Sequence, residues 1–370
     1  MNYSERQEKL RRELKRGSHV ILYIVEDSGG AQFRYRCNNL VETMEKSGWS
    51  VVWFLRSEID RVSFDGVSLV VVVRQTDKNG DFSEFIKRVN GANIEVLFDL
   101  DDLIFDYRDL PLLMKATNSK NVAYWMGYTW GIRRIAKRVD GFTCTNEFLA
   151  EKLRRSFGKP VKVIRNSLNK EQIEVLGRVV KKKKMRKSID DEFVIGYFSG
   201  SPTHVKDFAL VEPELIRFLD NYKNVKLRIV GYMKLSSKMQ ELVESGRVEV
   251  MELVDYLRLQ ELMGEVDVNI APLVINDFTN CKSELKFFEA AVVETTTIAS
   301  PNYSFKKAIV DGENGFLAKP GEWYDKLEYL YEHPNENRKI ALAAKEYALK
   351  HYYGKEFLKE VEAAYDYFAK

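Results

Sequence analysis

The segment from Cys281 to Ser300 holds the residues best suited to chemistry in this chain. An apolar run up to Leu273 predicts a strand, and a helix is expected to open at Lys282–Ser283 with Glu289 on its second turn. Open α/β sheets bind ligands at the carboxyl ends of their strands, and the free amides of a helix start attract phosphate. The segment therefore predicts an anion-binding site with a lysine and a carboxylate beside it.

A second group of candidate residues follows another apolar run, at Asp99–Leu100–Asp101–Asp102. Carboxylates clustered in this way could hold Mg²⁺ or Mn²⁺. Two other readings are open: Asp101 or Asp102 could hydrogen-bond the hydroxyls of a ligand, or could cap a helix. We expect no metal site here, because a pattern of three residues often arises by chance.

A third group is the Gly29–Gly30 turn with Arg34 and Arg36. Glycine lets the backbone approach a ligand closely, and arginine suits phosphate or carboxylate partners. The alternative is a tight strand-to-helix turn with arginines on the surface.

The elements that must position these residues alternate between strand and helix. In the first half, strands are predicted at 19–26, 51–55, 67–73, 94–98, 141–145 and 161–164, with helices between them. A second alternation begins at 193–200 and continues through 226–231, 248–253 and 266–273. Such alternation predicts parallel sheets covered by helices on both faces.

The chain is long enough for two domains. Residues 165–192 are polar and include the run KKKKMRK, a composition typical of a linker. The sequence therefore predicts an N-terminal Rossmann-like domain over 1–170, a linker over 171–192 and a C-terminal Rossmann-like domain over 193–353. The last helix, 354–370, is expected to pack back on the first domain.

Composition excludes several classes of protein. The net charge of +3 argues against a dedicated nucleic-acid binder, for which a strong basic bias is expected. The three cysteines have no metal-ligand spacing and indicate reduced thiols in the cytosol. The longest apolar run, at 67–73, suits a buried strand and is too short to span a membrane. We expect a cytoplasmic protein, at most peripheral on the inner face of the membrane.

Several motifs together resemble the glycosyltransferases of family 4, whose fold is called GT-B. In the C-terminal half, Gly200 is followed six residues later by a lysine, and IVDGENGFL at 309–317 matches a family stretch. Glu289 with Ala290 matches the second glutamate of the family's E-x(7)-E motif. In the N-terminal half, GGAQFRYR, VLFDLDDLIFD and VKVIRNSLN resemble further family stretches.

The resemblance implies two domains facing a cleft and a nucleoside-diphosphate sugar as donor. The leaving diphosphate needs fixed positive charge and N–H dipoles, which Lys206, Lys286 and the amides of Ser283–Leu285 could supply. Glu289 could accept both ribose hydroxyls. The expected catalytic residues are Lys206, Lys286 and Glu289. The expected donor site comprises Gly200, Ser201, His204, Lys206, Lys282, Ser283, Glu284, Leu285 and Glu289, and the expected acceptor site comprises Gly29, Gly30, Arg34, Arg36, Asp101 and Asp102.

The chain also departs from the family pattern. Cys281 stands where the first glutamate of E-x(7)-E is expected, and Ser201 stands where an arginine usually follows the glycine. In the family that glutamate contacts the transferred sugar, so sugar recognition is expected to differ here. Loss of activity is the alternative, which would leave a non-catalytic subunit that stabilises a partner glycosyltransferase.

The resemblance thus implies a hexosyltransferase that retains the anomeric configuration, and we expect it to need no cofactor or metal. The acceptor is expected to be a saccharide or a lipid-linked glycan. Basic stretches such as RRIAKR at 133–138 could attract an anionic membrane, although a charge run is more often a solvated linker. The aromatic residues of YWMGYTWG, 124–131, could contact a sugar or a lipid, or pack within a helical segment.

Overall fold

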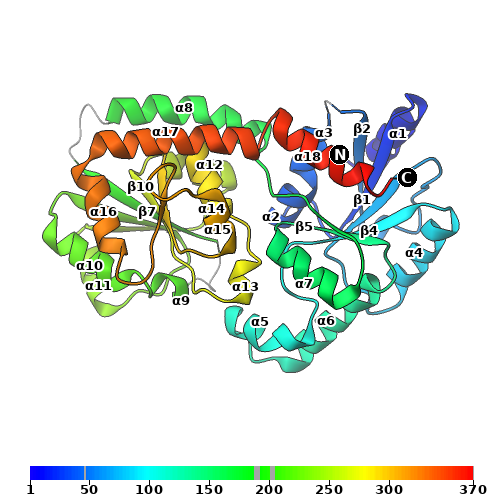
Figure 1. The fold of residues 1–370 in the computed structure, drawn as a ribbon, viewed down its shortest axis with the longest axis horizontal. Helices are drawn as coiled ribbons and strands as arrows, with labels where there is room; N and C mark the ends of the chain where they lie inside the picture. The colour runs from blue at the N-terminus through cyan, green and yellow to red at the C-terminus, as the bar shows by residue number, and fades with distance from the viewer. Residues whose placement is uncertain (46, 187–191, 201–204, 370) are drawn as a thin grey trace. The chain divides into compact units, whose positions relative to one another are not determined.

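The computed structural model describes residues 1–45, 47–186, 192–200 and 205–369 (Figure 1). Side-chain surroundings within the helix that ends at 186 are described up to residue 181. The chain divides into two compact units. Unit 1 comprises Met1–Asn169, Cys281–Ser283 and Tyr352–Lys370, and unit 2 comprises Lys170–Asn280 and Glu284–His351.

Unit 1 is built on a parallel six-stranded sheet in the order β2-β1-β3-β4-β5-β6. The strands read as nearly continuous apolar runs because helices cover both faces of a parallel sheet. All five residues of β3 are buried, for example. Strand order reverses beside β1, which makes a topological switch point. The strands are β1 His19–Val25, β2 Trp49–Leu55, β3 Leu69–Val73, β4 Glu95–Leu100, β5 Gly141–Cys144 and β6 Val161–Val163.

The helices of unit 1 include the C-terminal helix α18. Its apolar residues Phe357, Val361 and Tyr365 are buried in the same core as β1 and β2, and the hydroxyls of Tyr23 and Tyr365 are hydrogen-bonded to each other. The other helical elements are α1 Tyr3–Lys15, α2 Ala31–Phe33, the π-helix η1 Arg34–Asn38, α3 Asn39–Met44, η2 Arg56–Glu58, α4 Asp81–Gly91, η3 Tyr107–Asp109, α5 Leu110–Ala116, α6 Val122–Ala136 and α7 Glu147–Phe157, with α18 over Lys355–Asp366.

Unit 2 has a second parallel six-stranded sheet, in the order β12-β11-β10-β7-β8-β9. Its strands are β7 Phe193–Ser199, β8 Val225–Gly231, β9 Val248–Met251, β10 Val268–Ala271, β11 Thr296–Ala299 and β12 Phe316–Leu317. Its helices are α8 Lys170–Arg186, α9 Val205–Phe208, α10 Glu212–Asn221, α11 Ser237–Glu244, α12 Tyr256–Gly264, α13 Asp277–Asn280, α14 Leu285–Val292, α15 Tyr303–Ala308, α16 Trp323–Glu332 and α17 Pro334–His351.

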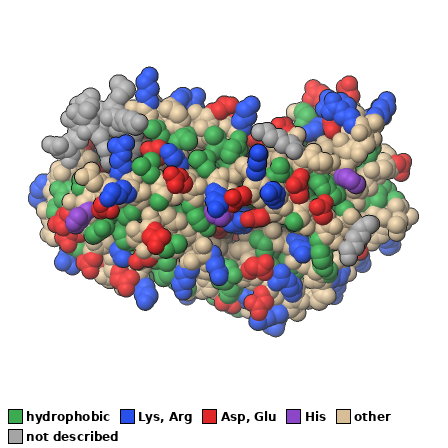
Figure 2. All heavy atoms as spheres, turned by 45° about the horizontal axis from the view of Figure 1, so that its top comes forward, with side chains coloured by type: hydrophobic (Ala, Val, Ile, Leu, Met, Phe, Trp, Pro, Cys, Tyr) green, Lys and Arg blue, Asp and Glu red, His purple; other side chains and the backbone are tan. Residues whose placement is uncertain are grey.

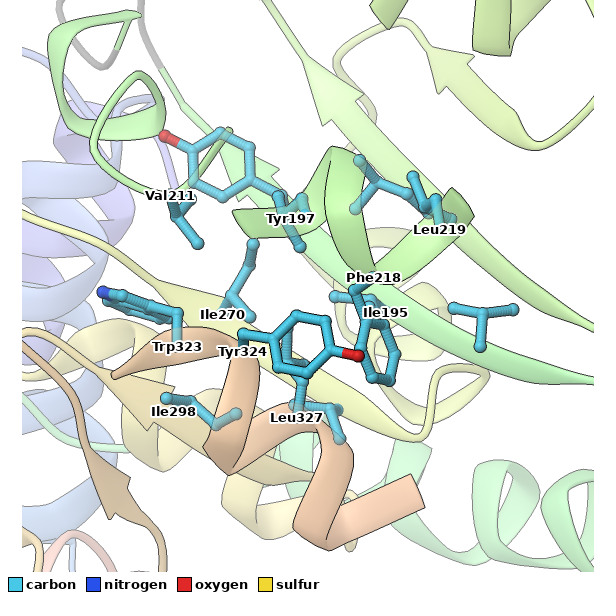
Figure 3. Close-up of a cluster of buried hydrophobic side chains, with 14 of the residues drawn as sticks. Ile195, Tyr197, Val211, Phe218, Leu219, Ile270, Ile298, Trp323, Tyr324 and Leu327 are labelled. Carbon is cyan, nitrogen blue, oxygen red and sulfur yellow. The ribbon is translucent and has the colours of Figure 1, made fainter. Parts of the chain in front are cut away.

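A cluster of buried aliphatic and aromatic side chains packs against this sheet (Figure 3). Tyr197 comes from β7, Phe218 from α10, and Trp323 and Tyr324 from α16. The rings of Phe218 and Tyr324 meet edge to face with centroids 5.5 Å apart. Large rigid rings bury much apolar surface at little cost in rotamer entropy, so this cluster fixes β7 against α10 and α16.

The expected linker at 171–192 is wrong for most of its length. Residues 170–186 form α8, which belongs to unit 2. Val175 and Val179 are buried, and Gly264 of α12 leaves the space that Val179 fills, because a Cβ at Gly264 would collide with it. The apolar residues recur at helical spacing, and the lysines of the run dominated the composition of this stretch and hid that periodicity.

The expected fold class, two doubly wound Rossmann-like α/β domains, is confirmed. The helix expected from residue 32 to 47 is interrupted, since η1 inserts a π-helical turn between α2 and α3. Helix α1 was not predicted.

The surface charges, the helices and the cysteines of the structure agree with the expectations drawn from composition. On the face drawn in Figure 2, Lys and Arg side chains are interspersed with Asp and Glu. None of the helices in the described residues is both long enough and apolar enough to cross a membrane. The three cysteines are free and buried, as expected of reduced thiols.

Candidate functional site

In unit 2, the candidate donor residues gather where β7 and β10 end. Gly200 follows β7 directly and is exposed. Lys206 lies exposed on α9, and the next residue, Asp207, is buried and accepts a hydrogen bond from the amide of Val274 (N–Oδ1 2.8 Å). The predicted residues Ser201 and His204 lie outside the described residues.

Lys286, on α14, lies beside Tyr197 of β7. Its Nζ is buried and has no hydrogen-bond partner among the described residues, while the rest of the side chain is partly exposed. The ammonium lies 4.9 Å from the centroid of the Tyr197 ring, within reach of a cation–π attraction. A desolvated cation without a hydrogen-bond acceptor is costly in a folded protein, so its position calls for an anionic ligand.

The protonation of Lys286 reflects these surroundings. Burial lowers its pKa to about 8, against the attraction of Asp207 and Glu289. Burial and the nearby Asp207 also raise the pKa of Tyr197. At neutral pH, Lys286 is therefore a cation that can be discharged by a small rise in pH.

Helix α14 positions Lys286 through its own backbone and its apolar face. The side-chain amide of Asn269, on β10, donates to the carbonyl of Lys286 (2.9 Å) and to the hydroxyl of Thr297 (3.0 Å). Phe287 and Phe288 are fully buried, and Glu289 is half-buried. The buried Phe287 and Phe288 and the hydrogen bond from Asn269 fix the orientation of α14. Lys286 and Glu289 are therefore held on the side of the helix that the phenylalanines do not occupy.

The start of this helix was predicted too early. Helix α14 begins at Leu285, and the buried Glu284 is its N-cap residue without a capping side-chain hydrogen bond. Lys282 and Ser283 lie in unit 1 together with Cys281. The side chains of Lys282 and Ser283 bind to residues of unit 1, which keeps these two residues out of the helix. Their charged and polar types had suggested a helix start at this position.

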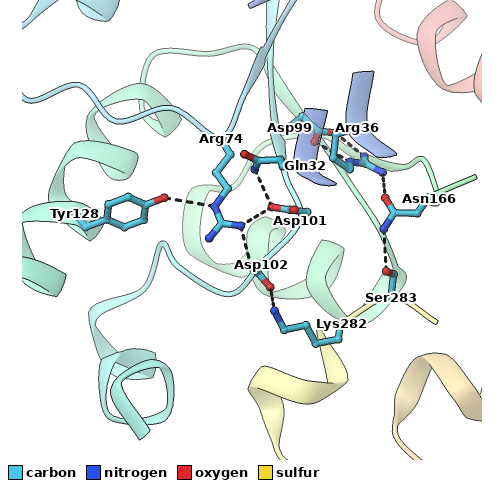
Figure 4. A network of polar contacts seen from close by, with 10 residues as sticks. All are labelled: Gln32, Arg36, Arg74, Asp99, Asp101, Asp102, Tyr128, Asn166, Lys282 and Ser283. Atoms are coloured by element: carbon cyan, nitrogen blue, oxygen red, sulfur yellow. Dashed lines mark hydrogen bonds and ion pairs between the residues drawn. The ribbon is translucent and has the colours of Figure 1, made fainter. Parts of the chain in front are cut away.

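In unit 1, a polar network joins the ends of β3 and β4 (Figure 4). Arg74, which follows β3, donates from Nη1 to Asp101 (3.1 Å) and to Asp102 (2.9 Å). The amide of Gln32 also donates to Asp101 (3.3 Å). Arg74 has a φ of 39°, a left-handed conformation that non-glycine residues rarely adopt. The two ion pairs aim its guanidinium at the carboxylates.

Lys282 and Ser283 complete this network. Lys282 is ion-paired with Asp102, and its carbonyl accepts from the amide of Asn146 (3.2 Å). The hydroxyl of Ser283 accepts from Asn166 (2.8 Å). Lys282 was predicted to replace a missing positive charge at the donor phosphates, but within unit 1 its charge is balanced by Asp102.

The two adjacent carboxylates respond to the network in opposite ways. Burial would raise the pKa of Asp102, but Lys282 and Arg74 together hold that pKa below its ordinary value. Burial, with the neighbouring carboxylates of Asp102 and Asp99, raises the pKa of Asp101 even though Arg74 opposes the shift. Lys282 therefore decides which of the two carboxylates is the more firmly ionised.

Arg36 does not lie at a ligand-facing surface, contrary to prediction. It is completely buried and makes a two-pronged contact with Asp99, with Nε–Oδ1 at 2.9 Å and Nη2–Oδ2 at 2.5 Å. Its Nη1 donates to the carbonyl of Ile164 (2.6 Å) and to Asn166 (3.1 Å). An arginine with these partners joins β4 to the end of β6, and its role is structural.

The Gly29–Gly30 turn is also satisfied internally. The amides of both glycines donate to Oδ1 of Asp27, each at 3.0 Å. These amides are therefore engaged in a turn, although both glycines are exposed. Arg34 is half-buried, with its guanidinium 5.8 Å from the ring of Tyr35.

The acidic run at 99–102 is arranged for ion pairing with the protein's own cations. Asp99 pairs with Arg36, whereas Asp101 and Asp102 share Arg74. Within the part of the chain that the structure describes, no group of three or more His, Cys, Asp or Glu side chains is placed to hold a metal ion.

Arg74, Asn166 and Asp207 are among the polar residues of these sites that were not predicted. Arg74 and Asn166 each follow a strand in unit 1, and Asp207 follows Lys206 in unit 2. Arg74 could have been predicted from its position at the end of a strand, because polar residues at strand ends line the edge where α/β sheets bind ligands. Asn166 lies in VKVIRNSLN, which was used only as a family resemblance.

Comparisons with known proteins agree with this architecture. Residues 193–333 match the family model described as Glycosyl transferases group 1. No sequence among the curated proteins matches the chain. Solved structures with the same fold include sucrose-phosphate synthase from Thermosynechococcus elongatus, at 14% identity and a TM-score of 0.65 over 94% of this chain and 98% of that one.

Two further structures give similar values. HepE of Anabaena in complex with UDP is 15% identical, with a TM-score of 0.64 over 95% of this chain and 100% of that one. A glycosyltransferase from Rickettsia africae is 13% identical, with a TM-score of 0.64 over 95% and 99% of the two chains. At these identities the likeness is one of fold. The resemblance to a divergent group 1 glycosyltransferase of GT-B fold is confirmed.

Proposed function

We propose that this chain, whose residues 193–333 match the group 1 glycosyl transferases, transfers a hexose from a nucleoside-diphosphate sugar to a saccharide or lipid-linked glycan. The resemblance implies retention of the anomeric configuration. HepE, which has the same fold, is described in complex with UDP and with UDP-glucose, which supports a uridine nucleotide as the first donor to test.

The observation that carries the proposal is the buried ammonium of Lys286. It has no hydrogen-bond acceptor among the described residues, although Asp207 and Glu289 attract it. A diphosphate bound at the carboxyl end of β7 would supply the missing acceptor. In a water-poor site, such a fixed charge stabilises the negative charge that grows on a leaving diphosphate more strongly than it would in water.

The neighbouring residues have roles that suit the same ligand. Exposed Lys206, on α9, is placed to add a second positive charge after the Gly200 loop. Glu289 lies one turn after Lys286 on α14 and offers two oxygens to the vicinal hydroxyls of ribose. Donor binding is thus assigned to unit 2, in which these residues all lie.

A thermal-shift panel tests the proposal. UDP, GDP, dTDP and CDP are added separately to the wild-type protein and to Lys286→Met, Glu289→Ala and Lys206→Ala. A ligand that binds only the folded state raises the melting temperature, so at least one nucleotide should stabilise the wild type and lose that effect in Lys286→Met.

The matched control is Lys238→Ala, which removes an exposed lysine of α11 in the same unit. It should respond to nucleotide as the wild type does. If no nucleotide shifts the wild type, the donor site is refuted. If a nucleotide binds but the matching nucleotide sugar is neither transferred nor hydrolysed, the chain is a non-catalytic subunit instead.

A further inference from the structure

Helix α6 of unit 1 exposes large apolar side chains that the donor chemistry does not use. Val122, Tyr124, Met126 and Trp130 have 52%, 50%, 50% and 47% of their surfaces exposed. Val122, Met126 and Trp130 follow one another at intervals of four residues, so they form a stripe along one face of the helix. Exposed apolar side chains gathered on one face mark an interaction surface, whereas single ones need no explanation.

The stretch of chain that contains α6 carries charged side chains of one sign only, although Arg134 is ion-paired with the buried Asp77 from outside it (3.4 Å). Residues 110–139, which contain α5 and α6, hold no Asp or Glu. Since the whole chain has a net charge of only +3, the rest of it is net negative, and the positive charge is concentrated here. The basic residues of the stretch are Lys115, Lys120, Arg133, Arg134, Lys137 and Arg138.

Basic and aromatic side chains are interleaved on this surface. The guanidinium of Arg134 lies 4.7 Å from the centroid of Trp130, and the ammonium of Lys78 lies 6.0 Å from that of Tyr124. Lys120, Lys137 and Arg138 are exposed at the two ends of the helix. Tryptophan and tyrosine favour the boundary between lipid headgroups and acyl chains, and lysine and arginine favour anionic headgroups.

We propose that the exposed face of α6, with the basic residues at its two ends, docks on the headgroup layer of an anionic lipid bilayer. The helix would lie in the plane of the interface, with Val122, Met126 and Trp130 entering it and the cations contacting lipid phosphates. Aliphatic Val122 and Met126 favour lipid over a polyanionic glycan, because they offer a sugar neither charge nor a flat ring. α5 and α6 lie side by side (Figure 1), so the basic stretch is brought to one region of unit 1.

This inference deepens the proposed function by naming a membrane partner, but it does not depend on sugar transfer. Vesicle binding needs no nucleotide, and nucleotide binding needs no vesicle. Each can therefore fail while the other stands.

The test places an environment-sensitive fluorophore at position 126 in the full chain. The native thiols Cys37, Cys144 and Cys281 are buried, so Met126→Cys provides a selectively labelled site. The matched control is Val250→Cys on β9 of unit 2, where the native side chain is 46% exposed and apolar. Vesicles of phosphatidylcholine, with and without phosphatidylglycerol, are the probe.

We expect the emission at position 126 to shift to the blue with phosphatidylglycerol vesicles only, and that at position 250 to stay unchanged. In a co-sedimentation assay, the double variant Lys137→Gln/Arg138→Gln should bind these vesicles about 25-fold more weakly, since each basic residue near an anionic surface contributes about fivefold. The double variant Lys238→Gln/Lys339→Gln, from exposed lysines of unit 2, should bind normally.

Four outcomes would overturn the inference. The first is no sedimentation with anionic vesicles. The second is sedimentation with position 126 still in water, which shows adsorption without insertion. The third is a shift caused by a soluble acidic polysaccharide without lipid. The fourth is a shift without lipid that tracks formation of a dimer, because then a second copy covers the surface.

Discussion

Lys282 forms an ion pair with Asp102 inside unit 1, although the next residues along the chain, from Glu284 on, belong to unit 2. The pair is partly shielded, with 37% of the Lys282 side chain and 14% of the Asp102 side chain exposed. Arg74, which follows β3, contacts the same carboxylate. Two cations, Arg74 and Lys282, thus neutralise two carboxylates at the ends of β3 and β4. Asp102 is paired with both cations, whereas Asp101 is paired with Arg74.

Replacing each carboxylate by an amide should reveal this inequality. The raised pKa of Asp101 means that its charge destabilises the fold at pH 7, so Asp101→Asn should leave the free energy of unfolding unchanged or raise it. The lowered pKa of Asp102 means that its charge is stabilising, and Asp102→Asn should lower the free energy of unfolding by about 2 kcal/mol. Urea unfolding at pH 7 measures both.

The sign of the pH dependence follows from the same shifts. The stabilisation from Asp102 is present above the pKa of an unfolded aspartate and is lost as the pH falls through the lower folded value. The cost of Asp101 is relieved by acid. Equal effects of the two substitutions at pH 7 would refute the assignment.

The buried pair of Arg36 and Asp99 should be essential for folding of unit 1. Arg36→Met leaves the fully buried Asp99 without its cation, and removal of one partner of a buried pair typically costs about 3–5 kcal/mol. Urea unfolding measures the loss. The double variant Arg36→Met/Asp99→Leu, which removes both charges, should recover part of it. A loss below about 1 kcal/mol for Arg36→Met would contradict a structural role.

Lys286 should weaken the fold in the absence of ligand. Its pKa of about 8 lies below the value of 10.5 for an unfolded lysine. The cost of the buried charge is therefore fully present below pH 8 and disappears as the pH rises towards 10.5. Lys286→Met should raise the free energy of unfolding at pH 7 by up to about 3 kcal/mol, since one pKa unit is worth about 1.4 kcal/mol.

The comparison is made by urea unfolding at pH 7 and at pH 10.5, with Lys238→Met as the control. The advantage of Lys286→Met should vanish at the higher pH. A variant that is less stable than the wild type at pH 7 would show that the lysine is stabilised by its surroundings instead.

Nucleotide binding should take up a proton at Lys286. A diphosphate beside the ammonium raises its pKa, so affinity should be greatest below pH 8 and fall by as much as about tenfold per pH unit above it. Calorimetry of UDP binding at pH 8 in two buffers of different ionisation enthalpy should register about half a proton taken up. Lys286→Met should bind weakly with no uptake at that site; uptake that persists in this variant would assign the proton to another group.

Nucleotide binding should not depend on a divalent metal. Asp99 and Asp101, the residues that suggested a metal site, are already ion-paired with Arg36 and Arg74. The thermal shift given by UDP should therefore be the same with EDTA as with added Mg²⁺ or Mn²⁺. A shift that requires metal would restore the metal-site hypothesis for the carboxylates at 99–102.

The sequence alone determined the two parallel sheets and the strand ends at which polar residues gather. The spacing and number of apolar residues are local properties of the sequence. Apolar runs such as 67–73 therefore identify buried strands without knowledge of the elements that pack against them. The same holds for Lys286 and Glu289, whose chemistry was read from their types and from the apolar residues around them. Composition also revealed the basic stretch near residues 133–138.

Only the tertiary structure decided which charges meet. Arg36 and Asp99 are far apart in sequence but pair in the core, Lys282 turns to Asp102, and the lysine-rich linker is a helix because Val179 fills the space that Gly264 leaves. A charged side chain can be solvated, paired or buried, and the free energy of each state depends on residues distant in the chain. For that reason the sequence predicted candidate ligand-binding residues, whereas the structure identified Lys286 as a buried cation without a hydrogen-bond acceptor among the described residues.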